Sequence, residues 1–198
     1  MKPTLDYPTK KFISEILNQF DVEGNNSLNL KLLELFNIFN NYSDVDEIKI
    51  KVAALNKIYS TGILNINPVI SIIAREINFE TKYLEEYQFV QLVDKISDIS
   101  WPDKNLVMHS RKNLSFSSKY IHFLSGFKTP ILDSYILNLI KEYQKMNGKK
   151  ISFSNSKGYL EFYKLFEEFK SDFNLEGYSN YEIDKFLWQY AKNLKTKI

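Results

Sequence analysis

One acidic residue, Asp133, lies where a carboxylate could do chemistry. It follows the run Thr129-Pro-Ile-Leu, and the residues after it have helical periodicity, so the sequence predicts that Asp133 opens a helix after a turn through Pro130. At that position an Asp accepts hydrogen bonds from the first backbone N–H groups and interacts favourably with the helix dipole. The same carboxylate could stabilise positive charge on a bound substrate. Taken alone, the local pattern favours the capping role.

The helix expected just before this turn carries the nearest polar candidates. Ser115, Lys119 and His122 recur at i, i+4 and i+7, so they are expected on one polar flank beside an apolar face. Lys119 is either partly desolvated, holding a phosphate or a modified base near Asp133, or a lysine whose stem packs while its charge stays in water. His122 is expected at the surface, where it could line the same site.

The segment 115–135 resembles the helix-hairpin-helix DNA glycosylase superfamily, which includes endonuclease III-like and adenine-mismatch glycosylases. In that superfamily the catalytic aspartate follows a Pro-Ile-Leu-like run at the start of a helix, after a helix of small residues that ends in Gly. The resemblance implies that Asp133 is catalytic and that the protein excises a damaged or modified base from DNA. It also implies two lobes, one at about 44–128 and the other made of 1–43 and 129–198.

The chain departs from the superfamily at two places. The superfamily hairpin offers the N–H groups of a Gly-x-Gly to a DNA phosphate, whereas the matching stretch 108–114 has no glycine. Either side chains replace those groups or the hairpin has been lost. The candidate phosphate-binding side chains are Arg111, Lys112, Asn113 and Ser115. Because Ser115 stands where bifunctional members carry a Schiff-base lysine, the resemblance implies a monofunctional glycosylase.

Two further segments could line the base pocket. In the superfamily, the helix end that matches residues around Tyr59 lines the pocket and fills the hole left by the flipped nucleotide. Tyr59 could therefore stack on a base, and Asn56 or Thr61 could read a base edge. Tyr59 also continues an apolar stripe of its own helix, which favours core packing. Trp188 lies off its helix's apolar stripe, so it either packs on a second element or stacks on a ligand.

The composition excludes several classes of protein. Without cysteine there is no disulfide, no Cys-ligated zinc and no iron–sulfur cluster, and two histidines exclude a His-rich metal site. The glycosylase reaction that the resemblance implies needs neither a metal nor an organic cofactor, which agrees with this composition, so we expect none. A net charge of +2, with 26 Lys+Arg against 24 Asp+Glu, permits nucleic-acid binding without demanding it. Neither a signal peptide nor a membrane-spanning run is found. We expect a cytoplasmic monomer.

Apolar residues recur with a helical period nearly throughout the chain. The clearest stripes fall within 136–146, 159–173 and 183–194, and less regular helical segments are expected at about 9–20, 28–41, 45–60, 68–77, 82–97, 103–110 and 116–125. No stretch shows the period-2 alternation of a half-buried strand, so no sheet is expected. The sequence therefore predicts an all-α fold of about ten helices.

Taken with the resemblance, these patterns predict a glycosylase that grips double-stranded DNA around 111–119 and flips one nucleotide into a cleft between two lobes. Asp133 would stabilise the cationic sugar, and modified phage DNA is one possible substrate. Two alternatives stay open: a non-catalytic nucleic-acid-binding module in which Asp133 only caps a helix, and an all-α protein-interaction domain. A base-sized cleft facing Asp133 would separate the first reading from the other two.

Overall fold

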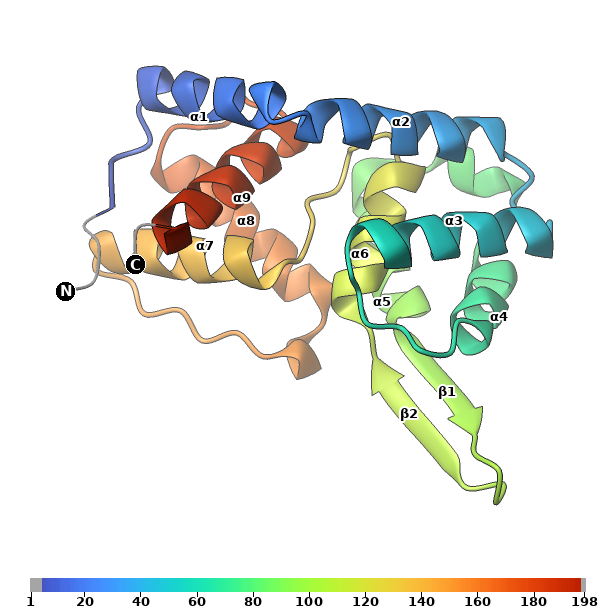
Figure 1. Cartoon of the computed structure of the whole chain (residues 1–198). Coiled ribbons are helices and arrows are strands. Elements are labelled where there is room, and N and C mark those ends of the chain that lie inside the picture. Colours follow the sequence, from blue (N-terminus) through green and yellow to red (C-terminus); the bar gives the residue numbers. More distant parts are fainter. Residues whose placement is uncertain (1–4, 197–198) are drawn as a thin grey trace.

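The computed structural model describes residues 5–196, which form a mostly helical protein (Figure 1). In chain order, the elements are α1 (Lys10–Val22), α2 (Asn25–Ile38), α3 (Val45–Ile58), α4 (Asn67–Glu76), η1 (Phe79–Tyr83), α5 (Glu86–Ser97), β1 (Asp98–Pro102), β2 (Met108–Lys112), α6 (Leu114–Leu124), α7 (Ser134–Met146), η2 (Asn155–Lys157), α8 (Tyr159–Asp172) and α9 (Asn180–Thr196). The predicted helical class is confirmed, and a small hairpin is added to it.

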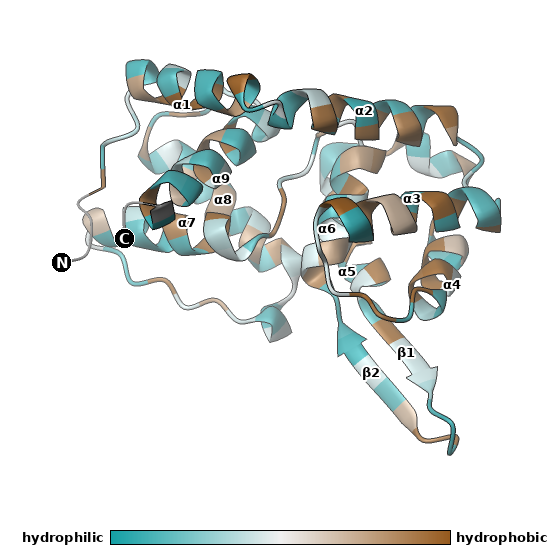
Figure 2. Ribbon diagram, viewed as in Figure 1, coloured by the Kyte–Doolittle hydropathy of each residue, from teal (hydrophilic) through white to brown (hydrophobic). Residues whose placement is uncertain are grey.

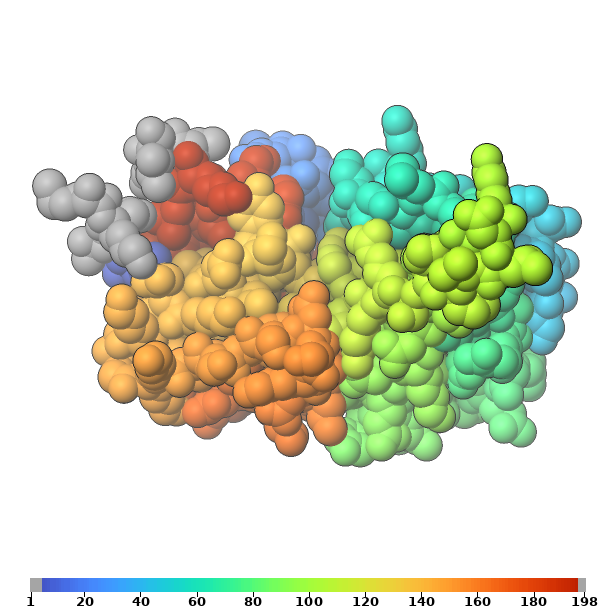
Figure 3. Space-filling view, turned by 90° about the horizontal axis from the view of Figure 1, so that it is seen from below, coloured from blue at the N-terminus to red at the C-terminus, as the bar shows by residue number. Residues whose placement is uncertain are grey.

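The helices form two groups that lie side by side. One contains α3 to α6, and the other contains α7 to α9 with α1 packed on α9. Helix α2 continues from α1 and packs against α3 and α6, so it lies on the first group although the predicted lobe boundary at 43/44 assigned it to the second. Seen from below, the two groups meet along a seam between the orange and green halves (Figure 3).

Most helices bury one stripe against a shared core. In α1 the buried residues Ile13, Ile16 and Phe20 fall at i, i+3 and i+7, the spacing of one helical face. Hydrophilic and hydrophobic residues accordingly alternate along α1 and α7 (Figure 2). Helix α6 differs, because every residue from Phe116 to Phe123 is buried. It therefore lies inside the molecule, covered on all sides.

The helix expected at 103–110 is absent; that prediction was wrong, and so was the expectation of no sheet. Strands β1 and β2 pair antiparallel, with Ile99 opposite Arg111. Asp103 closes the turn, since its Oδ1 accepts hydrogen bonds from the N–H of Asn105 and Val107 at 2.8 and 2.9 Å. Strand β2 is exposed almost throughout, so no apolar alternation marks it in the sequence.

One carboxylate joins the two groups. Asp94 of α5 caps α8, because its Oδ1 accepts from the Tyr159 N–H at 2.8 Å and its Oδ2 from the Leu160 N–H at 3.2 Å. Lys112 Nζ lies 3.6 Å from the same carboxylate. Gly158 precedes α8 with φ +84°, and a Cβ there would lie 2.8 Å from Asp94 Oδ1. Only glycine permits this close approach without strain.

Candidate functional site

A pocket of about 270 Å³ lies between the two helix groups. It is lined by Phe20, Asn25, Leu28, Asn29, Ile58, Tyr59, Lys119, His122, Ile131, Asp133, Ile136, Tyr181, Asp184, Lys185 and Trp188. Its walls are mainly apolar and aromatic, with a few convergent polar groups, which is the usual make-up of a small-molecule site. The pocket brings together five predicted site residues: Tyr59, Lys119, His122, Asp133 and Trp188.

The small side chains of α6 hold the next segment close to the helix. Because α6 is buried on all sides, its polar side chains need partners inside the protein. Ser117 Oγ donates to the Ile96 carbonyl at 3.3 Å. Ser118 Oγ donates to the Ser115 carbonyl at 3.1 Å and accepts the Leu132 N–H at 2.9 Å. This last bond fixes the chain directly before Asp133.

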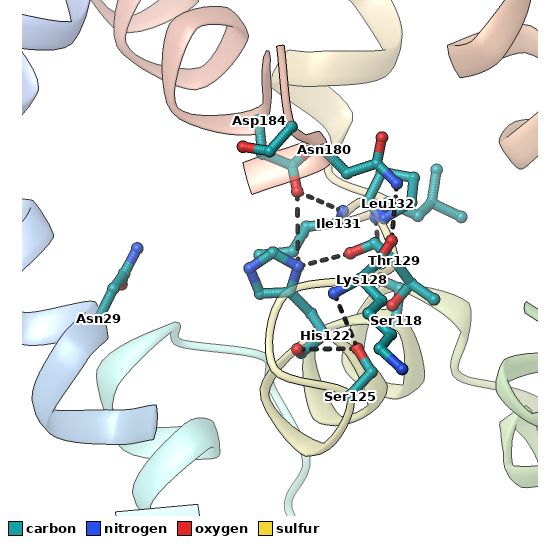
Figure 4. Close-up of polar contacts among 12 residues, drawn as sticks. Asn29, Ser118, His122, Ser125, Lys128, Thr129, Ile131, Leu132, Asn180 and Asp184 are labelled. Carbon is teal, nitrogen blue, oxygen red and sulfur yellow. Dashed lines mark hydrogen bonds and ion pairs between the residues drawn. The ribbon is translucent and has the colours of Figure 1, made fainter. Parts of the chain in front are cut away.

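Four further hydrogen bonds fasten the segment that leads to Asp133, and Figure 4 shows those that involve Ser125, Asn180 and Asp184. The Lys128 N–H donates to Ser125 Oγ at 3.1 Å, and Asn180 Nδ2 donates to the Lys128 carbonyl at 2.6 Å. The Ile131 N–H donates to an Asp184 oxygen at 2.8 Å, and the hydroxyl of Tyr159 donates to the Pro130 carbonyl. The turn is therefore held from α6, α8 and α9 together, so Asp133 has a fixed position.

Asp133 is the N-cap of α7, as the sequence predicted. Its Oδ1 accepts the Tyr135 N–H at 2.7 Å. Its Oδ2 lies 3.7 Å from Lys119 Nζ, and the side chain is 21% exposed. One oxygen therefore serves the helix while the other is available at the pocket, so capping and chemistry do not compete for the same atom.

Lys119 is a buried lysine rather than one that reaches into solvent. Its side chain is 4% exposed, and Nζ donates to Ser115 Oγ at 2.9 Å. Burial lowers the pKa of Lys119, while the charges of Asp133 and Asp184 act in the opposite direction. The ammonium also lies 5.7 Å from the centre of the Tyr59 ring. The pocket therefore holds an amine that loses its proton more readily than an ordinary lysine.

His122 is fully buried, so its expected surface position was wrong. The error arose because α6 has no solvent face. His122 Nδ1 lies 2.5 Å from the Thr129 carbonyl. Since a carbonyl oxygen only accepts hydrogen bonds, Nδ1 carries the hydrogen of the neutral ring. Burial lowers the pKa of His122 to about 4, so the ring is neutral at pH 7.

Asp184 of α9 faces this histidine. Asp184 was not among the site residues predicted from the sequence. Its Oδ2 accepts the Ile131 N–H at 2.8 Å and lies 3.7 Å from His122 Nδ1. Burial raises the pKa of Asp184 well above its ordinary value. Tyr181, one helical turn earlier, also lines the pocket and was missed. The available signal was their helical spacing to Trp188, since i, i+3 and i+7 share a face.

The three candidates near the end of α3 have separate roles. Thr61 Oγ1 donates to Asn56 Oδ1 at 2.7 Å, and Asn56 Nδ2 donates to the Ile63 carbonyl at 2.8 Å. Asn56 and Thr61 thus hold the turn after α3 and do not line the pocket. Tyr59 does line it, and its hydroxyl donates to Asn29 Oδ1 at 2.8 Å.

The four phosphate-binding candidates do not form one cluster. Arg111 is exposed on β2, and Lys112 faces Asp94. Asn113 is buried, and its N–H donates to the Ser97 carbonyl at 2.8 Å. Ser115 holds the Lys119 ammonium. The stretch that matches the superfamily's Gly-x-Gly hairpin is therefore mostly a β-strand that projects from the molecule (Figure 1).

Trp188 packs against a second element, which is one of the two roles considered for it, and it also lies at the pocket. Its ring meets the ring of Phe20 edge to face, with centroids 5.9 Å apart, so it packs on α1. It also lines the pocket. Together with Tyr59 and Tyr181, it gives the pocket aromatic surface on which a flat ligand can stack.

The fold and the pocket define a mostly helical protein with an acid–base site between two helix groups. The family model HI_0787_N, described as an N-terminal domain, matches residues 12–128, which is more than half of the chain, and the chain belongs to this family. No curated protein and no solved structure matches it. The matched range includes α6 but ends before Asp133 and Asp184.

Within residues 5–196, no group of three or more His, Cys, Asp or Glu side chains is arranged to hold a metal ion. None of the helices in the described part of the chain combines the length and apolar character needed to cross a bilayer.

Proposed function

We propose that the protein is a DNA glycosylase-like enzyme that takes a damaged or modified base from double-stranded DNA into the pocket and cleaves its N-glycosidic bond. One observation carries the proposal: Asp133 and Lys119, 3.7 Å apart, meet in a pocket of about 270 Å³ with aromatic walls. Enzymes that act on a base read it in such a pocket, flipped out and stacked between apolar side chains. The enzyme would act as a monomer in the cytoplasm.

In this proposal Asp133 stabilises the sugar while the base departs. As the bond from C1′ to the base breaks, positive charge develops on the sugar, and the carboxylate of Asp133 lies at the pocket to oppose it. Water adds to C1′, its proton is lost, and the base leaves after protonation. Asp133 can orient that water because its Oδ2 is not used by the helix cap.

A second reaction is favoured by the burial of Lys119. Its lowered pKa makes the neutral amine more available, and a neutral amine can attack C1′ in place of water. The base would leave, the sugar ring would open to an imine, and loss of the 3′ phosphate would break the strand. This route is the alternative to the monofunctional reaction expected from Ser115.

The test is incubation of the protein with duplex DNA carrying a panel of damaged and phage-type modified bases. We expect abasic sites that depend on Asp133. Asp133→Asn should keep the fold, because Asn caps helices as well as Asp does, but should lower base release by roughly a thousandfold or more, since the charge is lost. Asp46→Asn, at an exposed position in the first turn of α3, is the matched control.

The products of this incubation distinguish the two reactions from each other and from the two alternatives without catalysis. Strand breaks only after alkali indicate hydrolysis, whereas a borohydride-trapped adduct that disappears in Lys119→Met indicates the amine route. Full activity in Asp133→Asn contradicts the proposed role of Asp133. DNA binding without base release across the panel favours the non-catalytic module, and absence of DNA binding at low salt favours the protein-interaction domain.

A further inference from the structure

Two buried polar atoms beside the Lys119–Asp133 pair have no partner within residues 5–196. They are His122 Nε2 and Asp184 Oδ1, and each atom is almost inaccessible to solvent. Leaving such an atom unpaired is costly, so native proteins rarely retain one without a reason. Both residues line the pocket. In Figure 4, both atoms point toward the side on which Asn29, another pocket residue, lies.

The hydrogen-bonding character of each atom follows from the other end of its side chain. His122 Nδ1 donates to the Thr129 carbonyl, so in the neutral ring Nε2 has a free lone pair and can only accept. Asp184 Oδ2 accepts the Ile131 N–H, and burial favours the protonated carboxyl group. The proton then resides on Oδ1, which becomes a donor. The pocket wall thus presents an acceptor and a donor on neighbouring residues.

We propose that His122 and Asp184 read the edge of the bound base: His122 Nε2 accepts a hydrogen bond from an N–H of the base, and Asp184 Oδ1 donates to an adjacent acceptor. The ligand is therefore a flat heterocycle with an N–H donor beside an acceptor. An amino group next to a ring nitrogen, as in adenine, has this pattern, and so does a ring N–H next to a carbonyl, as in hypoxanthine. The inference deepens the proposed function, because it names the substrate class of the same pocket.

The polar groups around His122 support selection by hydrogen bonding rather than by charge. The titratable groups on this side are Lys119 on the same helix, Tyr181 and Asp184 from α9, Asp133 beyond Lys119, and the pocket residues Tyr59 and Lys185. None of them donates to or accepts from Nε2. A ligand N–H is thus matched to an atom that no side chain already occupies, and a site built in this way rejects an analogue that lacks the N–H.

The experiment is imidazole ¹⁵N NMR of the full chain, which has only two histidines, so that exposed His109 serves as an internal reference. The probes are 9-methyladenine, 9-methylhypoxanthine and 9-methylpurine, the last of which has no N–H. We expect the free protein to show His122 with hydrogen on Nδ1. Either of the first two bases should shift the Nε2 resonance of His122 and leave His109 unchanged. 9-Methylpurine should bind about tenfold more weakly or worse.

A variant isolates the proposed contact. His122→Asn places an amide N–H near the position of Nδ1 and removes Nε2, so it should lower the affinity for the donor-bearing base about five- to tenfold. His109→Asn should leave that affinity unchanged. If the His122 variant does not fold, the titration of the intact protein still decides the matter.

The inference is overturned if all three compounds bind equally, if Nε2 does not shift, or if no base binds at millimolar concentration. These results are separable from the fate of the proposed function. Base binding with a His122 shift but no base release from any DNA leaves the inference standing and removes the glycosylase proposal. Base release that requires Asp133, without any shift of the His122 resonance on base binding, supports the glycosylase proposal and removes the inference.

Discussion

Lys119 and His122 lie on adjacent turns of α6, and each faces a carboxyl group from another element. Comparison of these two acid–base pairs shows how the surroundings determine what a carboxyl group does. Lys119 and Asp133 are 3.7 Å apart, and so are His122 and Asp184. Asp133 retains contact with solvent and with a helix N-terminus, whereas Asp184 and His122 are buried. At equal distances, one pair thus has a carboxylate that keeps contact with water and with a helix N-terminus, and the other has a carboxyl group whose burial favours the neutral form.

The largest expected effect is the loss of folding stability at acid pH, where His122 of the buried pair must take up a proton. The pKa of His122 is about 4 in the folded protein against 6.5 in the unfolded chain. Between these values the unfolded chain binds more protons, so the contribution of His122 is complete above pH 6.5 and decreases as the pH falls toward 4. The loss is about 3 kcal/mol.

Urea unfolding from pH 7 to pH 4 measures this contribution. Comparison of the intact protein with His122→Asn isolates it, because the variant cannot titrate at this position, while His109→Asn should follow the intact protein. A His122→Asn variant that loses stability as steeply as the intact protein would show that His122 does not resist protonation. The contrast between the two pairs would then fail.

The second effect concerns Asp184, whose contribution to stability changes with pH in the opposite direction. Burial raises the folded-state pKa of Asp184 above its ordinary value of 3.8, so the folded protein holds a proton that the unfolded chain releases. Asp184 therefore lowers stability as the pH rises above about 4. Asp184→Asn removes this titration and keeps an oxygen for the Ile131 N–H, so its stability relative to the intact protein should increase with pH.

Thermal unfolding of both proteins at several pH values checks this expectation. The hydrogen bond from the Ile131 N–H favours the ionised carboxylate and offsets part of the effect of burial. An advantage of Asp184→Asn that does not change between pH 4 and pH 8 would mean that Asp184 is ionised in the folded protein, and the neutral pair would then be a charged one.

The smallest effect concerns Asp133 as a helix cap. Asp133→Ala removes the acceptor for the Tyr135 N–H and should cost about 1 kcal/mol, whereas Asp133→Asn should change stability by only a few tenths. Equilibrium urea unfolding of the two variants measures the difference. A much larger loss in Asp133→Asn would mean that the carboxylate is needed for folding, and its activity could then not be interpreted as chemistry.

The helical elements were predictable because their apolar stripes repeat along the chain. The hairpin was not, because β2 buries nothing and its order depends on Asp103 and on pairing with β1. In the site, Asp133 was predictable from its local run and its helix start. Asp184 was not, because its environment is created by the Ile131 N–H and by His122, which reach it only when α9 packs beside the turn.

The capping of α8 by Asp94 has a consequence for how the ligand of the proposed function would enter the pocket. A wide rotation of the two helix groups away from each other at this contact would strip Tyr159 and Leu160 of their N–H acceptor, at a cost of about 1 kcal/mol, and would undo the approach that Gly158 permits. We therefore expect the two helix groups to keep their relative positions when a ligand enters the pocket. Under the proposed function, the nucleotide would therefore change its conformation more than the two helix groups would.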